Sequence, residues 1–264
     1  GQTHKEDILT GSEAAAAGGV TSVACMPNTK PPVDSVETIR YILNKAEKAK
    51  ARVYPVACVT RGMDGKELTD MAALKSTGAV AFSDDGRPVK NARVMLEGMQ
   101  HAACVGRKVL SHCEDLDLIN GGIMHKGDVS RLLGVPGMDR ASEDSITARE
   151  ICLSASSGAP IHICHVSTKG SIDLIRNAKA QGTRVTCETA PHYFILDHQK
   201  LLSKDADYRM NPPLREPKDI RAVLGGIADG TIDCIITDHA PHSAEEKADF
   251  YTAPNGVVGL ETSF

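Results

Sequence analysis

Three ionisable side chains follow a short apolar run near the end of the 264-residue chain. The run is Cys234-Ile235-Ile236, and Asp238, His239 and His242 come just after it. Such a run is typical of a buried strand, and in an α/β barrel the carboxyl ends of the strands carry the active site. A carboxylate there can bind a metal ion and can accept a proton from a water bound to that ion. Asp238 is therefore the first candidate for a catalytic residue.

Four other apolar runs also end in polar residues, namely Asn28, the pair Asp84-Asp85, His112 and His165. Taken singly, each has a structural explanation, because asparagine caps helices, aspartates before glycine form turns, and histidines at strand ends make hydrogen bonds. Their shared placement at strand ends is harder to obtain by chance. Neutral imidazole and carboxylate suit zinc, and two zinc ions can share a bridging group. The pattern therefore predicts a zinc site.

The remaining histidines fit this pattern less well. His192 follows another apolar run and lies near the predicted site, but the sequence assigns it no role. His162 should point to the opposite strand face from His165, since side chains alternate along a strand. Four others are predicted to be structural or exposed: His4, His101, His125 and His198.

Short apolar runs alternate with helix-like segments along the whole chain. The predicted strands are Val20–Cys25, Val53–Ala57, Ala79–Phe82, Lys108–Ser111, Ile161–Cys164, Arg184–Glu188 and Cys234–Thr237. The predicted helices are Val36–Ala49, Leu68–Ser76, Ala92–Cys104, Ser145–Ser156, Ser171–Ala180 and Pro217–Ala228. The strands are apolar throughout, which is typical of a covered parallel sheet. Seven strand–helix units favour a TIM-type (β/α)8 barrel whose first strand is missing, and Glu114–Arg140 is predicted to be an irregular loop.

Composition excludes several classes of protein. Charged residues are 24%, the net charge is −4 and aromatic residues are 3%, so no nucleic-acid surface is indicated. No apolar run has the length of a membrane span, and these residues show no signal-peptide pattern. There is no C-x-x-C pair among the eight cysteines, which favours a cytoplasmic protein with reduced thiols. Six are predicted to be buried: Cys25, Cys58, Cys152, Cys164, Cys187 and Cys234.

Five segments occur in an order that resembles a known family. They are Met26-Pro27-Asn28-Thr29, His112-Cys113-Glu114-Asp115, Ile163-Cys164-His165-Val166-Ser167-Thr168, Met210-Asn211-Pro212-Pro213-Leu214-Arg215 and Asp238-His239-Ala240-Pro241-His242. Together they resemble the class I dihydroorotases of the amidohydrolase superfamily over essentially the whole chain. The resemblance implies two zinc ions and the reversible conversion of (S)-dihydroorotate to N-carbamoyl-L-aspartate in pyrimidine biosynthesis. It also implies that the protein could form a homodimer or associate with aspartate carbamoyltransferase. Neither nucleic acid nor a membrane is expected as a partner.

The resemblance also implies roles for individual residues. Asp85 matches the position that bridges the two metals, where many relatives have a carboxylated lysine, and Asp84 is the less suitable of the two aspartates. His112 and His165 match ligands of the second zinc, and Asp238 matches a ligand of the first zinc that also serves as acid and base. The substrate-binding positions are Asn28, Asn211, His242, Asn255 and Gly256, although relatives commonly have phenylalanine at the place of Asn255.

The chain starts without methionine and stops within a predicted helix, which suggests a segment of a longer protein. Residues 1–264 are predicted to form one incomplete barrel domain that lacks the first strand, the last helix and the small β domain of the family. The His-x-His-x-Arg motif of the family's first strand is absent here. We therefore expect this segment alone to have little activity and the full-length protein to be active.

Two other functions remain open at this stage. Another cyclic amidohydrolase, such as a hydantoinase or an allantoinase, typically uses the carboxylated lysine, and Asp85 argues against it. A non-catalytic homologue that scaffolds aspartate carbamoyltransferase usually loses metal ligands, whereas every ligand position within this segment is intact.

Overall fold

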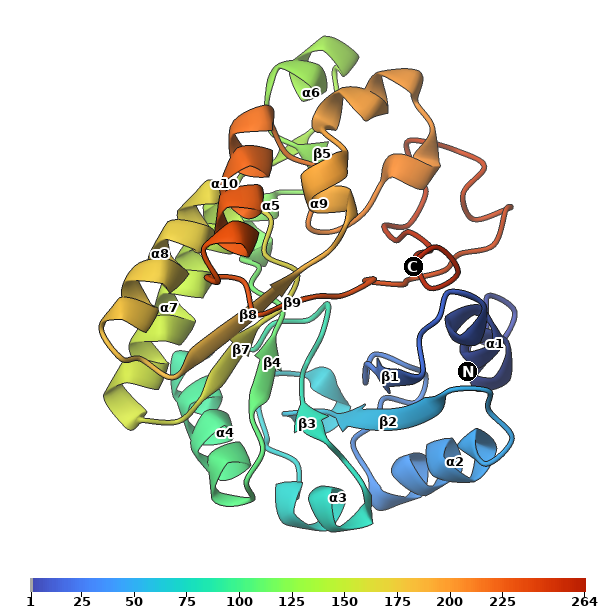
Figure 1. Ribbon diagram of the computed structural model, residues 1–264, viewed down its shortest axis with the longest axis vertical. Coiled ribbons are helices and arrows are strands. Elements are labelled where there is room, and N and C mark those ends of the chain that lie inside the picture. Colours follow the sequence, from blue (N-terminus) through green and yellow to red (C-terminus); the bar gives the residue numbers. More distant parts are fainter. Residues whose placement is uncertain (1) are drawn as a thin grey trace. The chain divides into compact units, whose positions relative to one another are not determined.

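The computed structural model describes residues 2–264 and divides them into two compact units (Figure 1). Unit 1 comprises residues 2–112, 153–162 and 259–264, and unit 2 comprises residues 113–152 and 163–258. The prediction of a single incomplete barrel domain stays a prediction.

Unit 1 alternates helices with strands that pair in parallel. Ser22 pairs with Arg52, Val56 with Ala81, and Phe82 with Val109, so each strand follows its neighbour in the same direction. Its elements are α1 (Ile8–Ala17), β1 (Ser22–Cys25), α2 (Val36–Ala46), β2 (Arg52–Ala57), η1 (Arg61–Met63), α3 (Met71–Thr77), β3 (Ala81–Phe82), α4 (Ala92–Cys104) and β4 (Val109–Ser111).

Local sequence explains where these helices begin and which side they bury. Ser35 caps α2 by accepting from the backbone N–H of Thr38, and Asn91 caps α4 by accepting from that of Arg93. Helix α2 buries only Ile39 and Ile42, which recur at helical spacing on one face. An amphipathic helix of this kind covers a sheet, and α2 packs on β2.

Unit 2 contains most of the remaining elements. They are α5 (Leu116–Ile119), β5 (Met124–His125), α6 (Asp128–Leu133), β6 (Gly137–Met138), α7 (Ala141–Ser157), β7 (Ile161–Ile163), α8 (Lys169–Ala180), β8 (Val185–Thr189), α9 (His192–Ile195), η2 (His198–Ser203), η3 (Ala206–Tyr208), α10 (Pro217–Ala228) and β9 (Cys234–Ile235). Helix α7 and strand β7 are divided between the units. Hydrogen-bonded strands follow the order β1-β2-β3-β4-β7-β8-β9, and β5 pairs with β6.

An apolar core in unit 2 lies beneath the long connections rather than beneath the sheet. Its buried members are Met124, Val129, Leu201, Met210, Leu214 and Phe250. This core anchors the segment that carries Asn211, because Met210 and Leu214 lie on either side of it in the sequence.

All seven predicted strands and all six predicted helices are present. Helices α4 and α10 have the predicted ends, and the ends of α2, α3, α7 and α8 are shifted. Helix α1 was not predicted, because its alanine-rich sequence has no clear apolar stripe. The prediction that Glu114–Arg140 is irregular was wrong, since this stretch contains α5, β5, α6 and β6. These elements are only two to six residues long, too short to show a periodic pattern.

No disulfide joins cysteines within residues 2–264. The predicted burial was wrong for Cys152 and Cys234, which are exposed, and Cys25 is only partly covered. An apolar run does not reveal which of its side chains faces solvent. None of the helices in the described part of the chain is both long enough and apolar enough to cross a bilayer.

Two adjacent glycines in α10 give a matched test of packing. A Cβ added at Gly225 would meet nothing within 4 Å, whereas one at Gly226 would lie 3.2 Å from side-chain atoms of Ile232. Because alanine favours a helix over glycine, we expect Gly225→Ala to raise the free energy of unfolding by about 0.5–1 kcal/mol. Crowding should cancel this gain in Gly226→Ala. Urea denaturation of both variants measures the difference, and equal stabilisation would contradict the packing described.

Candidate functional site

In unit 1, three of the predicted residues lie together at the carboxyl ends of parallel strands. Asn28 follows β1, Asp85 follows β3 and His112 follows β4. The Asn28 side-chain amide donates to Oδ2 of Asp85 at 2.9 Å, and His112 Nδ1 lies 3.6 Å from Oδ1 of the same carboxylate. The two oxygens of Asp85 therefore face different groups, a neutral donor and a buried imidazole.

The neighbouring aspartate is directed elsewhere. Asp84 is buried and accepts from the backbone N–H groups of Val59 at 2.8 Å and Thr60 at 3.2 Å, and from the Thr60 hydroxyl. Burial raises the pKa of Asp84 above its ordinary value, and these hydrogen bonds oppose the rise. Asp84 thus holds the ends of β2 and β3 together.

In unit 2, His165, His192 and Asp238 form a second group of ionisable side chains. His192 Nε2 lies 3.8 Å from Oδ2 of Asp238. Burial, followed by the charge of His165, lowers the pKa of His192 to about 4. His192 follows β8, and this position at a strand end was the only sequence signal for it.

Both predicted metal ligands of this group have an unusual backbone. His165 has a φ of 35° and Asp238 a φ of 50°, in the left-handed region that residues with a Cβ seldom adopt. Such a residue costs about 1–3 kcal/mol and persists where its surroundings hold it, most often at functional sites. His165 lies two residues after the end of β7, and Asp238 lies three residues after the end of β9.

Asn211 has a partner that the sequence did not suggest. Its side-chain amide donates to Oε1 of the buried Glu114 at 2.6 Å. The backbone next to it is fixed by the Tyr193 hydroxyl, which donates to the carbonyl of Pro212 at 2.8 Å. Glu114 belongs to the same run as His112, but the sequence assigned it no role.

The segments that carry His242 and Gly256 lie against each other. His242 Nε2 is 3.0 Å from the carbonyl oxygen of Asn255, and the N–H of Ala240 donates to the carbonyl of Val257 at 2.9 Å. Gly256 has a φ of 152°, and a Cβ there would lie 2.4 Å from the Ala240 carbonyl oxygen. Only glycine allows this close approach. Asn255 therefore meets His242 through its backbone rather than through its side chain.

The donor groups in each unit fit a zinc ion. Tetrahedral zinc with bonds of about 2.0–2.2 Å places its ligand atoms about 3.3 Å apart. The 3.6 Å between His112 and Asp85 is close to this value and longer than a hydrogen bond. In unit 2, the buried Nε2 of His192 has no hydrogen-bond partner and faces a carboxylate. Imidazole nitrogen and carboxylate oxygen are both zinc ligands.

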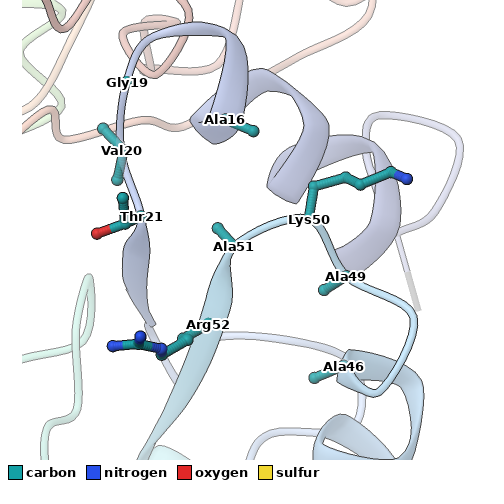
Figure 2. Close-up of a pocket in the computed structure, with 9 residues that line it drawn as sticks. All are labelled: Ala16, Gly19, Val20, Thr21, Ala46, Ala49, Lys50, Ala51 and Arg52. Carbon is teal, nitrogen blue, oxygen red and sulfur yellow. The ribbon is translucent and has the colours of Figure 1, made fainter.

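A cavity of 480 Å³ in unit 1 is not part of this arrangement (Figure 2). It lies at the amino ends of β1 and β2, the opposite strand ends from Asn28 and Asp85. Its lining contains no histidine, aspartate or glutamate: Ala16, Gly19, Val20, Thr21, Ala46, Ala49, Lys50, Ala51 and Arg52.

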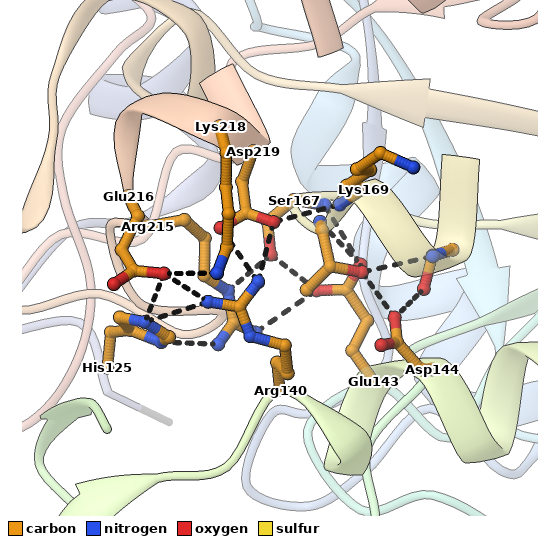
Figure 3. A network of polar contacts seen from close by, with 12 residues as sticks. His125, Arg140, Glu143, Asp144, Ser167, Lys169, Arg215, Glu216, Lys218 and Asp219 are labelled. Carbon is orange, nitrogen blue, oxygen red and sulfur yellow. Dashed lines mark hydrogen bonds and ion pairs between the residues drawn. The ribbon is translucent and has the colours of Figure 1, made fainter. Parts of the chain in front are cut away.

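A buried ionic cluster lies within unit 2, around His125 (Figure 3). Arg140 Nη2 is 3.2 Å from one ring nitrogen of His125, and Arg215 Nη1 is 3.3 Å from the other. Glu216 lies 3.7 Å from the ring, and His198 meets it edge to face. A neutral imidazole has one acceptor nitrogen, so only one guanidinium can donate to it.

Solved structures with similar folds cover nearly the whole chain. L-Hydantoinase from Arthrobacter aurescens matches 97% of this chain and 59% of its own, with a TM-score of 0.82 and 22% identity. Dihydropyrimidinase from Brevibacillus agri matches 98% of this chain and 59% of its own, with a TM-score of 0.79 and 24% identity. At such identity the likeness concerns the fold alone. It confirms the predicted fold class, an α/β protein of the TIM-barrel type.

Sequence comparison identifies the family. A family model described as "Dihydro-orotase-like" matches residues 1–171. Two curated relatives named dihydroorotase, from Trichlorobacter lovleyi and Citrifermentans bemidjiense, are 53% and 52% identical to this chain over its full length. The chain spans 62% of the length of each. The chain belongs to the dihydroorotase-like family.

The His125 environment predicts an acid-dependent loss of stability. Burial first, and then the charges of Arg215 and Arg140, lower the pKa of His125 to about 3. The unfolded state takes up this proton below about pH 6.5, so it binds more protons than the folded state between pH 6.5 and 3. The free energy of unfolding should therefore fall with acid by up to about 1.4 kcal/mol per pH unit from this group. His125→Gln should lack this contribution when the free energy of unfolding is measured by urea titration from pH 6 to 4. If that free energy falls equally steeply with acid in the variant and in the wild type, the prediction is wrong.

Proposed function

We propose that the protein carrying this chain is a dihydroorotase, which interconverts (S)-dihydroorotate and N-carbamoyl-L-aspartate with two zinc ions. The observation that carries the proposal is the identity of about half of all residues with curated dihydroorotases along the entire chain. The likeness to hydantoinases, at 22–24% identity, is one of fold and favours no second activity.

We infer the metal ligands from the family pattern and from the contacts within each unit. Asp85 is the proposed bridging ligand, and its split contacts to Asn28 and His112 support that role. His112 and His165 are the proposed ligands of one zinc, and Asp238 of the other. The strained backbone of His165 and Asp238 supports a functional role for both.

The proposed substrate contacts are polar and mostly neutral. Asn28 and Asn211 can offer amide hydrogen bonds to the substrate's polar edges, and His242 can donate to its carboxylate. Asn255 and Gly256 are proposed to contribute backbone groups, because the close approach at Gly256 brings the Asn255 carbonyl to His242. This also explains why a residue other than phenylalanine can stand at the place of Asn255.

In the hydrolytic direction, Asp238 is the proposed proton carrier. A bound zinc ion would act as a Lewis acid and would lower the pKa of the water that it holds. The Asp238 carboxylate accepts one proton of the attacking water as the new C–O bond forms at the ring amide carbon. It then delivers this proton to the nitrogen as the ring C–N bond breaks, which gives a carboxylic acid and a ureido NH₂ group, and the acid releases its remaining proton to solvent to become the carboxylate. Nε2 of His192 faces this carboxylate at 3.8 Å.

Location and assembly are further proposals. The lack of disulfides among the described cysteines supports the reducing cytoplasm as the place of action. A homodimer or association with aspartate carbamoyltransferase stays a prediction from the family.

Removing the proton carrier gives a direct test. Asp238→Asn in the full-length protein should lower kcat for dihydroorotate ring opening by about 10²- to 10⁴-fold, the usual contribution of general acid–base catalysis. The matched control is Asp229→Asn, which removes an exposed carboxylate paired with Arg176 in the same unit. Its kcat should be unchanged. An Asp238→Asn variant with more than a tenth of wild-type activity would remove Asp238 from this role.

Metal removal tests the cofactor. Dialysis against a chelator should abolish ring opening, and adding zinc should restore it. Metal analysis of the full-length protein should give two zinc ions per chain, and His112→Asn should lower that number. Full activity of the metal-free protein would be incompatible with the proposed mechanism.

A further inference from the structure

Glu143 has a buried carboxylate with an unusually complete set of donors (Figure 3). Its Oε1 accepts from the backbone N–H groups of Ser167 at 3.0 Å and Thr168 at 3.1 Å, and from the Thr168 hydroxyl at 3.1 Å. Its Oε2 accepts from the Ser167 hydroxyl and from Nη2 of Arg215 at 3.2 Å. Burial alone would raise the pKa of Glu143, but Arg215 and these hydrogen bonds lower it below its ordinary value. The carboxylate is therefore charged and fully engaged.

These bonds fix the backbone directly after His165. Val166, the residue between His165 and Ser167, is also held by the strand next to it. The N–H of Val166 donates to the carbonyl of Glu188 at 2.8 Å, and the carbonyl of Val166 accepts from the Thr189 hydroxyl at 2.8 Å. His165 thus has β7 before it and a doubly anchored segment after it. Because a left-handed backbone persists only where its surroundings impose it, these anchors hold His165 at a φ of 35°.

Arg215 extends the same anchor to a second segment. Its Nε donates to the Ser167 hydroxyl at 3.0 Å, and its carbonyl accepts from the N–H of His198 at 2.9 Å. Arg215 lies four residues after Asn211 in the sequence. One carboxylate–guanidinium pair therefore ties together the backbone after His165 and the backbone after Asn211.

We propose that Glu143, paired with Arg215, is a positioning residue that sets the direction of the His165 imidazole toward the metal. Glu143 would not itself bind the ion, because both of its oxygens already accept from this chain. The inference rests on the proposed function, since it takes His165 to be a metal ligand.

The test uses Glu143→Gln in the full-length protein. Glutamine has nearly the same shape, but it is neutral, and its NH₂ group cannot accept from Ser167 or Arg215. In metal-free protein, backbone hydrogen exchange of the peptide that contains residues 165–168 should speed up at least about tenfold. Affinity for Co²⁺, measured from its visible absorption, should fall about 10- to 100-fold, as expected when support of a metal ligand is lost. In turnover assays kcat should fall, and Glu143→Asp, which keeps the charge, should recover part of the loss.

The matched control is Asp173→Asn, which breaks exposed ion pairs with Lys169 and Arg176 in the same unit. It should leave exchange, Co²⁺ affinity and kcat unchanged. If Glu143→Gln does not fold, Ser167→Ala removes the hydroxyl that donates to Glu143 and accepts from Arg215 Nε, and leaves the carboxylate in place. It is judged by the same measurements, with a smaller change in the same direction.

The outcomes separate the two proposals. Wild-type protein that binds no Co²⁺ overturns the proposed function. Wild-type protein that binds Co²⁺, with a folded Glu143→Gln variant of equal affinity and equal exchange, overturns the positioning role alone. Faster exchange together with weaker Co²⁺ binding supports it.

Discussion

Parallel pairing in a fixed register is the constraint on which the candidate site depends. Since β1 to β4 all run the same way, the residues after them emerge at one edge, and Asn28, Asp85 and His112 meet there although 84 residues separate the first from the last. A shift of one residue in any pairing would turn a strand's side chains to the other face. The helices on the sheet secure this register by burying apolar residues such as Ile39. The positions of the polar side chains at the strand ends therefore depend on how the helices pack on the strands.

In unit 2 the residues after the strands need additional support, because strand direction alone does not aim His165 and Asp238. Both have a left-handed backbone, which is unfavourable without external contacts. For His165 that support comes from Glu143 and Arg215. The Glu143 carboxylate accepts from Arg215 and also from the backbone N–H of Ser167, two residues after His165. A buried ion pair seldom adds stability over apolar packing, so its value here lies in fixing geometry.

The sequence predicts the strands and the residues that follow them, because apolar runs and the polar residues after them are local features. It does not predict the contacts of those residues. His192 carries no signal beyond its position after β8, and Glu114 and Glu143 look like ordinary residues near the start of helices. The two glutamates take their roles from distant partners. Glu114 accepts a hydrogen bond from Asn211, 97 residues away, and Glu143 accepts one from Arg215, 72 residues away. Helix α1 and the short elements between Glu114 and Arg140 were missed for another reason, since they lack periodic patterns.

The adjacent aspartates Asp84 and Asp85 show how a local pattern acquires two functions through the fold. Asp85 stands in the turn after β3, in which the N–H of Arg87 donates to the carbonyl of Asp84 at 2.9 Å, so fixing Asp84 fixes the start of that turn. Asp84 is fixed by the backbone of Val59 and Thr60 at the end of β2. The Asp85 carboxylate lies instead against Asn28 and His112. The buried carboxylate of Asp84 thus anchors the turn that carries Asp85, the proposed bridging ligand, in the same way that Glu143 is proposed to support His165.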